Sequence, residues 1–369
     1  MKRARLDKLA SVTLRLGLRH EVVLGTEIPA VMGTVVAGRL LTSKSSYNKL
    51  EDTTGRMTDL RPGDLIAGAL GERHALHGYS GVVPSEVLVG DTLQLLNAGG
   101  VIGSGEGSVP GLGAPHDVEV LGAVLGFDGL DRTRGVAANI ADAALPLAPL
   151  VAAPLPASEG SSAGLPPVLV LVGTAMDAGK TTAASAIIAG LTRRGLRVAA
   201  GKLTGVSLRR DILQMSDAGA DSTCLFTDFG IVTSTADNAC ATARAILAYL
   251  AESEPDLIVL EMGDGLLGPY GVGPILADEV VGPAFTSTVL CAQDPVGVWG
   301  AEQLLKEILG RGAALVSGPV SDTPVGRQFC EEKLGLEAHN ALLAPDDLVR
   351  AALTSLGLDA TLEVAGALR

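Results

Sequence analysis

The chain has 369 residues, of which 47% are hydrophobic and 19% charged, and its 28 Lys and Arg against 41 Asp and Glu give a net charge of −13. This length is typical of two domains, and the composition is that of a globular rather than a disordered protein. Only 3% of the residues are aromatic, whereas surfaces that bind nucleic acid need basic stripes and stacking rings. We therefore expect no nucleic-acid partner.

The chain also carries no sign of a membrane or an oxidising compartment. No apolar run approaches the ~20 residues of a membrane span, and the basic start lacks the long apolar region of a secretion signal. Cysteines are few and form no C-x-x-C pair; they are Cys224, Cys240, Cys291 and Cys330. The sequence predicts a cytoplasmic protein whose thiols are small buried side chains.

Residues 1–140 are expected to form a β-rich N-terminal domain. Short apolar runs separated by Gly-containing turns predict strands at 20–25, 31–41, 64–70 and 91–97. Strands at this spacing indicate a small barrel or sandwich. Residues 141–167 are rich in Pro and Ala, which favours a semi-extended linker over a helix or a central strand.

Residues 168–369 are expected to form an α/β domain with a mostly parallel sheet. Continuous apolar strands alternate with helices along this part of the chain, a pattern typical of a parallel sheet covered on both faces. Such sheets bind ligands at the carboxyl ends of their strands. The predicted strands are 168–173, 196–202, 256–262, 287–293 and 313–320, and the predicted helices lie near 180–195, 237–254 and 301–309.

The strongest local signal is the run GTAMDAGKTT, residues 173–182, between a predicted strand and a predicted helix. Backbone N–H groups around Gly179 can hold phosphate oxygens at the helix N-terminus. Lys180 would neutralise phosphate charge and the Thr181 hydroxyl would bind Mg²⁺. The spacing is a variant, since Gly173 lies one residue earlier than in the usual phosphate loop. The predicted cofactor-binding residues here are Gly173, Thr174, Asp177, Ala178, Gly179, Lys180, Thr181 and Thr182.

This loop, GT-x-x-D-x-GKT, resembles that of dethiobiotin synthetase and the related cobyrinic acid synthases, which are P-loop NTPases. The resemblance continues through about residue 325, with Lys202 in GKLTG, the run Ser216–Asp217–Ala218, and Leu260–Gly265 after a strand. It implies an α/β P-loop NTPase fold, ATP and Mg²⁺ as cofactors, Asp217 as a metal-holding residue and a homodimer.

Elementary chemistry assigns roles to the same residues. Mg²⁺ prefers oxygen ligands, which Thr181, Asp217 and Glu261 would supply from neighbouring strand ends. Asp221 is the alternative to Asp217. Lys202 would act with Lys180 as a catalytic cation, stabilising charge on a carboxylate, carbamate or mixed anhydride.

Two further positions belong to the predicted site. Asp177 would orient a second cation or an amine substrate, and Gly263 would line the cofactor site. The family's Ala-Gly-Gly after the Glu is replaced here by Met262–Gly263–Asp264, which changes the substrate side. Thr204 or Ser207 would replace the family's substrate-binding Ser.

The first half holds weaker signals. The polar segment 42–49 contains two Lys and several hydroxyls that could bind a phosphate or carboxylate, although a solvated loop is the favoured interpretation. The partial dinucleotide pattern at 103–107 is interpreted as a flexible turn. His74 and His77 have the spacing of metal ligands but no further ligand beside them.

The sequence therefore predicts an ATP- and Mg²⁺-dependent enzyme that phosphorylates a carboxylate or carbamate of a small molecule and forms a C–N bond. Two alternatives stay open. One is a coenzyme A-dependent N-acyltransferase on the same loop scaffold, and the other is an NTPase switch or metallochaperone.

Overall fold

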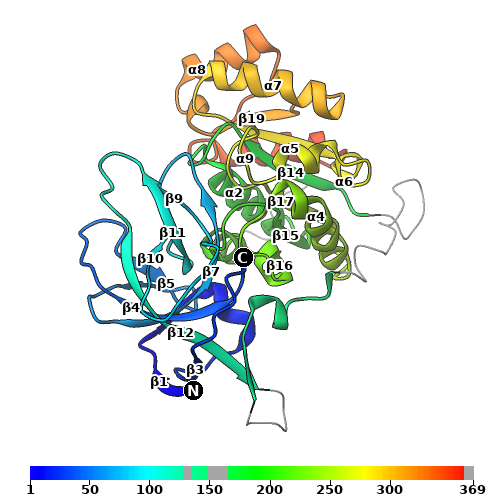
Figure 1. The fold of residues 1–369 in the computed structure, drawn as a ribbon. Coiled ribbons are helices and arrows are strands. Elements are labelled where there is room, and N and C mark those ends of the chain that lie inside the picture. The colour runs from blue at the N-terminus through cyan, green and yellow to red at the C-terminus, as the bar shows by residue number, and fades with distance from the viewer. Residues whose placement is uncertain (128–133, 148–164, 361–369) are drawn as a thin grey trace, which may run out of the picture. The chain divides into compact units, whose positions relative to one another are not determined.

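The computed structural model describes residues 1–127, 134–147 and 165–360. These residues form two compact units (Figure 1). The barrel unit comprises Met1–Leu145 together with two later segments, Val206–Arg210 and Phe226–Thr233. The phosphate-loop unit comprises the described residues of Pro146–Gly205, Asp211–Leu225 and Ser234–Arg369. The sequence predicts two domains separated by one linker at residues 141–167, whereas the barrel unit also includes two segments that follow this linker. Residues 148–164 of the linker lie outside the described residues.

The barrel unit is β-rich, as the alternation of short apolar runs and turns predicts. Its elements are β1 (Lys2–Arg5), β2 (Lys8–Leu9), η1 (Ser11–Leu16), β3 (Glu21–Gly25), β4 (Val35–Leu40), β5 (Lys49–Glu51), β6 (Met57–Asp59), β7 (Leu65–Leu70), β8 (Arg73–His74), β9 (Tyr79–Val82), β10 (Thr92–Leu95), β11 (Val101–Ser108), β12 (His116–Phe127), β13 (Gly135–Ala137), η2 (Ile140–Ala143) and η3 (Phe226–Phe229).

Five of these strands close a small barrel. β12 pairs with β4, β4 with β7, β7 with β11, β11 with β10, and β10 again with β12. The long strand β12 pairs with β4 and β10, and its register against β4 shifts between Val120 and Gly122. A β-bulge of this kind bends a strand around a barrel. Val35, Val36, Ile66 and Ile102 are fully buried in its core.

The phosphate-loop unit alternates strands and helices. Its elements are β14 (Val168–Gly173), α2 (Lys180–Arg193), β15 (Val198–Lys202), α3 (Arg210–Asp217), β16 (Ser222–Leu225), α4 (Ala236–Ala251), β17 (Leu257–Glu261), α5 (Val272–Ala277), α6 (Val281–Ala284), β18 (Ser287–Cys291), α7 (Pro295–Leu309), β19 (Leu315–Ser317), η4 (Pro319–Ser321), α8 (Pro324–Phe329), the π-helical turn η5 (Cys330–Leu334) and α9 (Pro345–Ser355). The start of α3 is shared with the barrel unit.

All six strands of this unit are parallel, in the order β16-β15-β17-β14-β18-β19. Helices α2 and α9 pack together and contact the sheet, while α4 contacts β15 and β16 and packs on α5. β14, β15, β17 and β18 are buried along their whole length, because helices cover both faces of a parallel sheet. The predicted fold class, a P-loop α/β domain plus a β-rich domain, is confirmed.

Candidate nucleotide site

The phosphate loop connects β14 to α2 at the carboxyl edge of the parallel sheet. Its backbone makes two left-handed residues, Asp177 with φ 57° and Gly179 with φ 87°. Lys180 opens α2 and folds back over Gly173, where a Cβ atom would lie 2.8 Å from the Lys180 Nζ. That ammonium donates a hydrogen bond to the Ala175 carbonyl oxygen at 2.7 Å. The Lys180 ammonium therefore lies within the phosphate loop, where its predicted role of neutralising phosphate charge requires it.

Glu261 at the end of β17 faces the first turn of α2. β14 and β17 pair in parallel with Leu171 beside Glu261, so the strand ends meet at one edge. The Thr181 hydroxyl lies 2.9 and 3.0 Å from the two Glu261 carboxylate oxygens, to which it donates. Glu261 is 2% exposed, and burial is the main cause that raises its pKa, with Lys202 opposing the shift.

Lys202 adds a second buried cation beside this carboxylate. Strand pairing places Lys202 beside Glu261, with the Lys202 Nζ 4.0 Å from Glu261 Oε1. The same ammonium forms an ion pair with the Asp211 carboxylate in the first turn of α3. Burial also lowers the pKa of Lys180, and Glu261 opposes that shift. Two lysines and two carboxylates therefore form one buried charge cluster.

Asp217, the predicted metal ligand, does not join this cluster. It is the exposed last residue of α3, and six residues of helix separate it from Asp211 by about 9 Å along the axis. The alternative, Asp221, lies at the amino edge of the sheet, where its amide donates to the Val198 carbonyl at 2.8 Å. The acidic residue that the structure brings to Lys202 is Asp211, which the sequence analysis did not select.

A signal for Asp211 exists in the sequence. It lies nine residues after Lys202, in the first turn of a short amphipathic helix that buries Ile212 and Met215. An acidic residue in the first turn of a helix that follows a sheet strand points back toward the carboxyl edge, where the helix dipole also favours it.

The remaining predicted residues occupy the loop and its neighbours. Asp177 is exposed, and its carbonyl oxygen accepts a hydrogen bond from Gln293 Nε2 at 2.9 Å. Thr182 is exposed on α2, whereas Ala178 is buried. The amide of Thr174 donates to the Cys291 carbonyl at 3.0 Å. Burial raises the pKa of the Cys291 thiol to about 12, so this neighbour of the loop stays protonated.

Gly263 lies in the loop after β17, where its backbone contacts the loop after β15 at the carboxyl edge of the sheet. A Cβ atom there would lie 2.3 Å from the Thr204 carbonyl oxygen, and the Thr204 hydroxyl donates to the Gly263 carbonyl at 3.1 Å. Thr204 is fully buried, so this hydroxyl holds the loops together. Ser207, the other suggested substrate-binding residue, belongs to the barrel unit.

The weaker signals of the first half have structural explanations. The Lys44 ammonium donates to the Leu112 carbonyl at 3.1 Å and lies 5.3 Å from the centre of the Tyr79 ring. Residues 103–107 are part of strand β11, so the expected turn is wrong. Among the described residues, no group of three or more His, Cys, Asp or Glu is placed to hold a metal ion.

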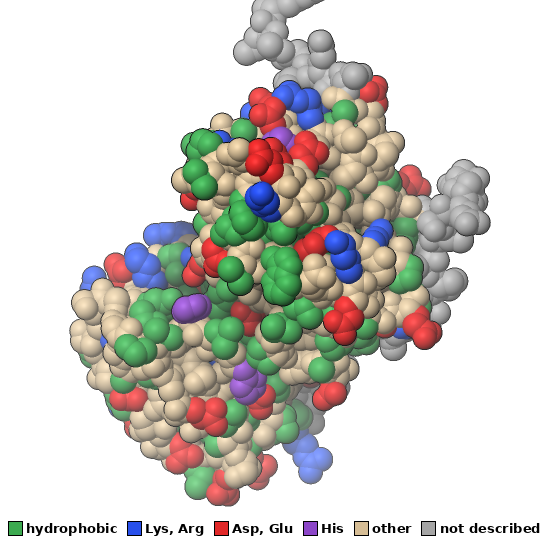
Figure 2. Space-filling model, turned by 90° about the horizontal axis from the view of Figure 1, so that it is seen from above, with side chains coloured by type: hydrophobic (Ala, Val, Ile, Leu, Met, Phe, Trp, Pro, Cys, Tyr) green, Lys and Arg blue, Asp and Glu red, His purple; other side chains and the backbone are tan. Residues whose placement is uncertain are grey.

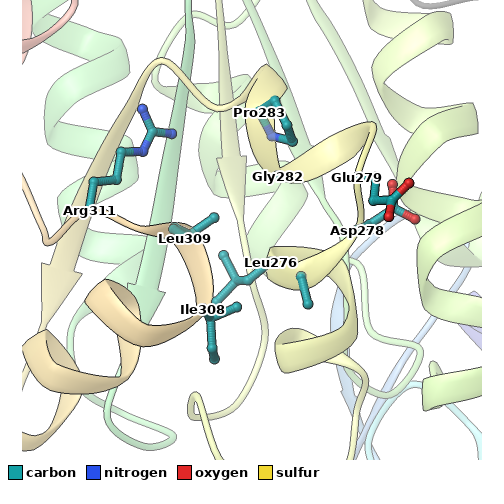
Figure 3. Close-up of a pocket in the computed structure, with 9 residues that line it drawn as sticks. Leu276, Asp278, Glu279, Gly282, Pro283, Ile308, Leu309 and Arg311 are labelled. Carbon is teal, nitrogen blue, oxygen red and sulfur yellow. The ribbon is translucent and has the colours of Figure 1, made fainter.

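A surface hollow of about 370 Å³ lies elsewhere in the phosphate-loop unit (Figure 3). Arg311 lines one side and donates a hydrogen bond to the Thr286 carbonyl at 3.2 Å, immediately before β18. The amino end of β18 and the phosphate loop are at opposite edges of the sheet, so this hollow is not part of the charge cluster.

The distribution of charge on the surface and the hydropathy of the helices concern nucleic-acid and membrane partners. On the face drawn in Figure 2, basic side chains are scattered singly or in small groups among acidic ones. Within the described ranges, no helix is both long enough and apolar enough to cross a membrane.

No protein-family model matches the chain, and neither does any curated protein. Among solved structures, it is similar to the signal recognition particle receptor FtsY from Elizabethkingia anophelis in complex with GDP, with 13% identity over 52% of this chain and 62% of that one and a TM-score of 0.37. It is also similar to the signal recognition particle 54 kDa protein from Aeropyrum pernix K1 in complex with GDP, with 16% identity, 53% and 47% coverage, and a TM-score of 0.37. The chain spans less than two thirds of either protein.

The class of protein follows from the chain's own architecture. The sheet has six parallel strands, and Lys180 closes the loop from β14 to α2. A carboxylate from the adjacent strand accepts from the Thr181 hydroxyl. Together these features define a P-loop NTPase fold. That fold is a nucleotide-binding one.

Proposed function

We propose that this chain binds ATP with Mg²⁺ on the phosphate loop and transfers the terminal phosphoryl group to a carboxylate or carbamate of a small molecule. An amine would then attack the carbonyl carbon of the resulting mixed anhydride, forming the C–N bond as the C–O bond to phosphate breaks, with inorganic phosphate leaving and the amine proton passing to solvent. The observation that carries the proposal is the buried cluster in which Glu261 accepts from Thr181 and faces Lys202. The resemblance to dethiobiotin synthetase supports the reaction class and a homodimeric assembly.

The cluster has the donor chemistry of a magnesium site. A threonine hydroxyl and two carboxylates, Glu261 and Asp211, are hard oxygen ligands of the kind that Mg²⁺ takes in addition to water and phosphate. The Thr181 hydroxyl donates to Glu261, and the Lys202 ammonium pairs with Asp211 and lies 4.0 Å from Glu261 Oε1. Mg²⁺, when bound, would neutralise charge on the phosphate oxygens.

The chain's own residues would supply the rest. Lys180 and the N–H groups at the start of α2 would hold the phosphates, as helix N-termini do. A carboxylate acceptor is itself an anion and is repelled by a triphosphate, so it needs a further cation. Lys202, beside the cluster, would supply that charge. Such an acceptor needs no proton removed before it attacks.

Binding and turnover test the proposal. We expect calorimetry to show ATP binding that Mg²⁺ strengthens and that Lys180→Ala weakens by about tenfold or more, since a charge-assisted contact is lost. When amines and bicarbonate are added to the protein with ATP and Mg²⁺, we expect ADP to be released. Binding of acetyl-coenzyme A alone, without Mg²⁺ dependence, would contradict the proposal and indicate the acyltransferase. Nucleotide hydrolysis that no acceptor stimulates would indicate a switch.

A further inference from the structure

Glu51 is a buried carboxylate in the barrel unit that the proposed chemistry does not use. It ends strand β5 and is fully buried. Its Oε2 accepts hydrogen bonds from the Arg209 backbone N–H at 2.7 Å and from the Ser11 hydroxyl. Its Oε1 is buried with no hydrogen-bond partner among the described residues. Burying a carboxylate costs free energy. The hydrogen bond to the Arg209 amide therefore suggests why a carboxylate stands at this position.

The segment around Arg209 is held from several sides within the barrel unit. The Arg209 guanidinium forms an ion pair with Asp228 at 2.7 Å, and both side chains are largely buried. Two residues earlier, the Ser207 carbonyl accepts from Asn97 Nδ2 at 2.8 Å and the Ser207 amide donates to the Val232 carbonyl at 2.8 Å. The segment 206–210 is thus fixed by both its backbone and its side chains.

This segment leads directly into α3 and the charge cluster. Asp211 follows Arg209 by two residues, a span of at most about 7 Å, and its carboxylate pairs with Lys202 beside Glu261. We propose that Glu51 is a positioning residue, which holds the amide of Arg209 and so fixes the start of α3 and the Asp211 carboxylate for Mg²⁺. The inference rests on the proposed function, in which Asp211 is a magnesium ligand.

The two oxygens of Glu51 suggest a matched pair of variants. Glu51→Gln keeps an oxygen for the Arg209 amide and the Ser11 hydroxyl, whereas Glu51→Ala removes both acceptors. Partners that orient metal ligands typically contribute about 10–100-fold to metal affinity. We therefore expect Glu51→Ala to lose about tenfold of the gain that Mg²⁺ gives to ATP affinity, with Mg²⁺-free affinity unchanged and Glu51→Gln close to wild type.

Hydrogen exchange gives a second readout that needs no nucleotide. We expect Glu51→Ala to exchange amides faster over residues 210–215, and Glu51→Gln to retain the wild-type rate. Val118→Ala, which opens the barrel core elsewhere, controls for lost stability and should change neither readout. If Glu51→Ala does not fold, Asp228→Asn, which releases the Arg209 side chain, should show both effects.

The outcomes separate the inference from the proposed function. A wild-type protein whose ATP affinity ignores Mg²⁺ would refute the magnesium site, while hydrogen exchange would still report on Glu51. An unchanged magnesium gain and unchanged exchange in folded Glu51→Ala would overturn the positioning role. So would equal losses in Glu51→Ala, Glu51→Gln and Val118→Ala, since these would reflect general destabilisation.

Discussion

Lys202 lies between two buried carboxylates, and their charges explain why all three side chains can be buried. An isolated ammonium or carboxylate in a low-dielectric interior pays a desolvation penalty of several kcal/mol. Here the Lys202 ammonium pairs with Asp211 and lies 4.0 Å from Glu261, which also accepts from Thr181. Lys180 adds a second positive charge beside Glu261, so the cluster contains two acids and two bases.

Asp211 and Asp217 form a matched pair for testing this cluster, because they lie at opposite ends of one short helix. Asp211→Asn should reduce the magnesium gain in ATP affinity by at least about tenfold, since a charged ligand is lost. Asp217→Asn should leave it unchanged and alter stability by no more than about 0.5 kcal/mol, as exposed substitutions do. Calorimetry with and without Mg²⁺ measures both, and the reverse ranking would restore Asp217 as the ligand.

Some of these residues could be predicted from the sequence, and physical reasons separate them from the rest. Glu261 is a carboxylate at the end of an unbroken apolar strand, and Lys180 follows a glycine at a strand-to-helix junction. Both patterns predict a position at the carboxyl edge of the parallel sheet, where ligands bind. Asp211 lies in the first turn of an eight-residue helix, and so short an element gives only a weak periodic signal in the sequence. The Ser-Asp-Ala resemblance instead favours Asp217, which lies six residues further along α3.

At the scale of elements, the turn after β19 supports the phosphate loop. Gly318 has φ 87°, and a Cβ atom there would lie 2.3 Å from the Ala178 carbonyl oxygen and 3.0 Å from that of Ala292. On the other side, a Cβ atom on Gly179 would lie 3.1 Å from the Gly318 Cα. The loop and the turn approach this closely only because both residues are glycines.

Gly318→Ala should therefore displace the phosphate loop. We expect ATP affinity to fall by about tenfold or more, because a shift of about 1 Å spoils backbone contacts to a ligand. Gly310→Ala is the control, since Gly310 has φ 69° but nothing within 4 Å of its Cβ position. Gly310→Ala pays a left-handed backbone cost of about 1–2 kcal/mol, whereas Gly318, with φ 87° and ψ −170°, has a conformation that is essentially restricted to glycine, so the thermal stability of both variants is measured beside their ATP affinity. If calorimetry shows equal ATP affinity in the two, the close contact does not matter for binding.

Element boundaries show where local patterns are insufficient. The sequence analysis expected a helix near 301–309, but α7 begins at Pro295. Its first two turns contain Pro295, Gly297 and Gly300, which are residue types typical of turns. The helix starts there because the Asp294 side chain accepts from the amides of Val296 and Gly297 at 2.9 Å, and proline is favoured at the first helical position.

At the scale of the whole molecule, the barrel unit is completed by residues far along the chain. Val232 is fully buried in the hydrophobic core of that unit, and Val206 packs against it. The Thr233 hydroxyl donates to the Glu72 carbonyl at 2.6 Å. The two segments that carry these residues follow β15 and β16. A division at a single linker, as the composition suggested, misses them because Pro and Ala content reports local stiffness and not long-range packing.

A fragment comprising residues 168–369 should therefore fold poorly, although it contains the entire parallel sheet. Exposing Val232 alone costs about 1.5–3 kcal/mol, and the Arg209 backbone N–H loses its acceptor, the Glu51 carboxylate. Against a typical stability of 5–15 kcal/mol, these losses are large. We expect the fragment to bind a hydrophobic dye, to melt without a cooperative transition and to lose ATP binding, all measurable beside the full chain. Adding residues 1–147 in trans should restore a cooperative transition, because that piece supplies Glu51, Glu72 and the barrel core. A fragment that melts cooperatively and binds ATP like the full chain would show that the two segments fold without the barrel, and that the nucleotide site is independent of it.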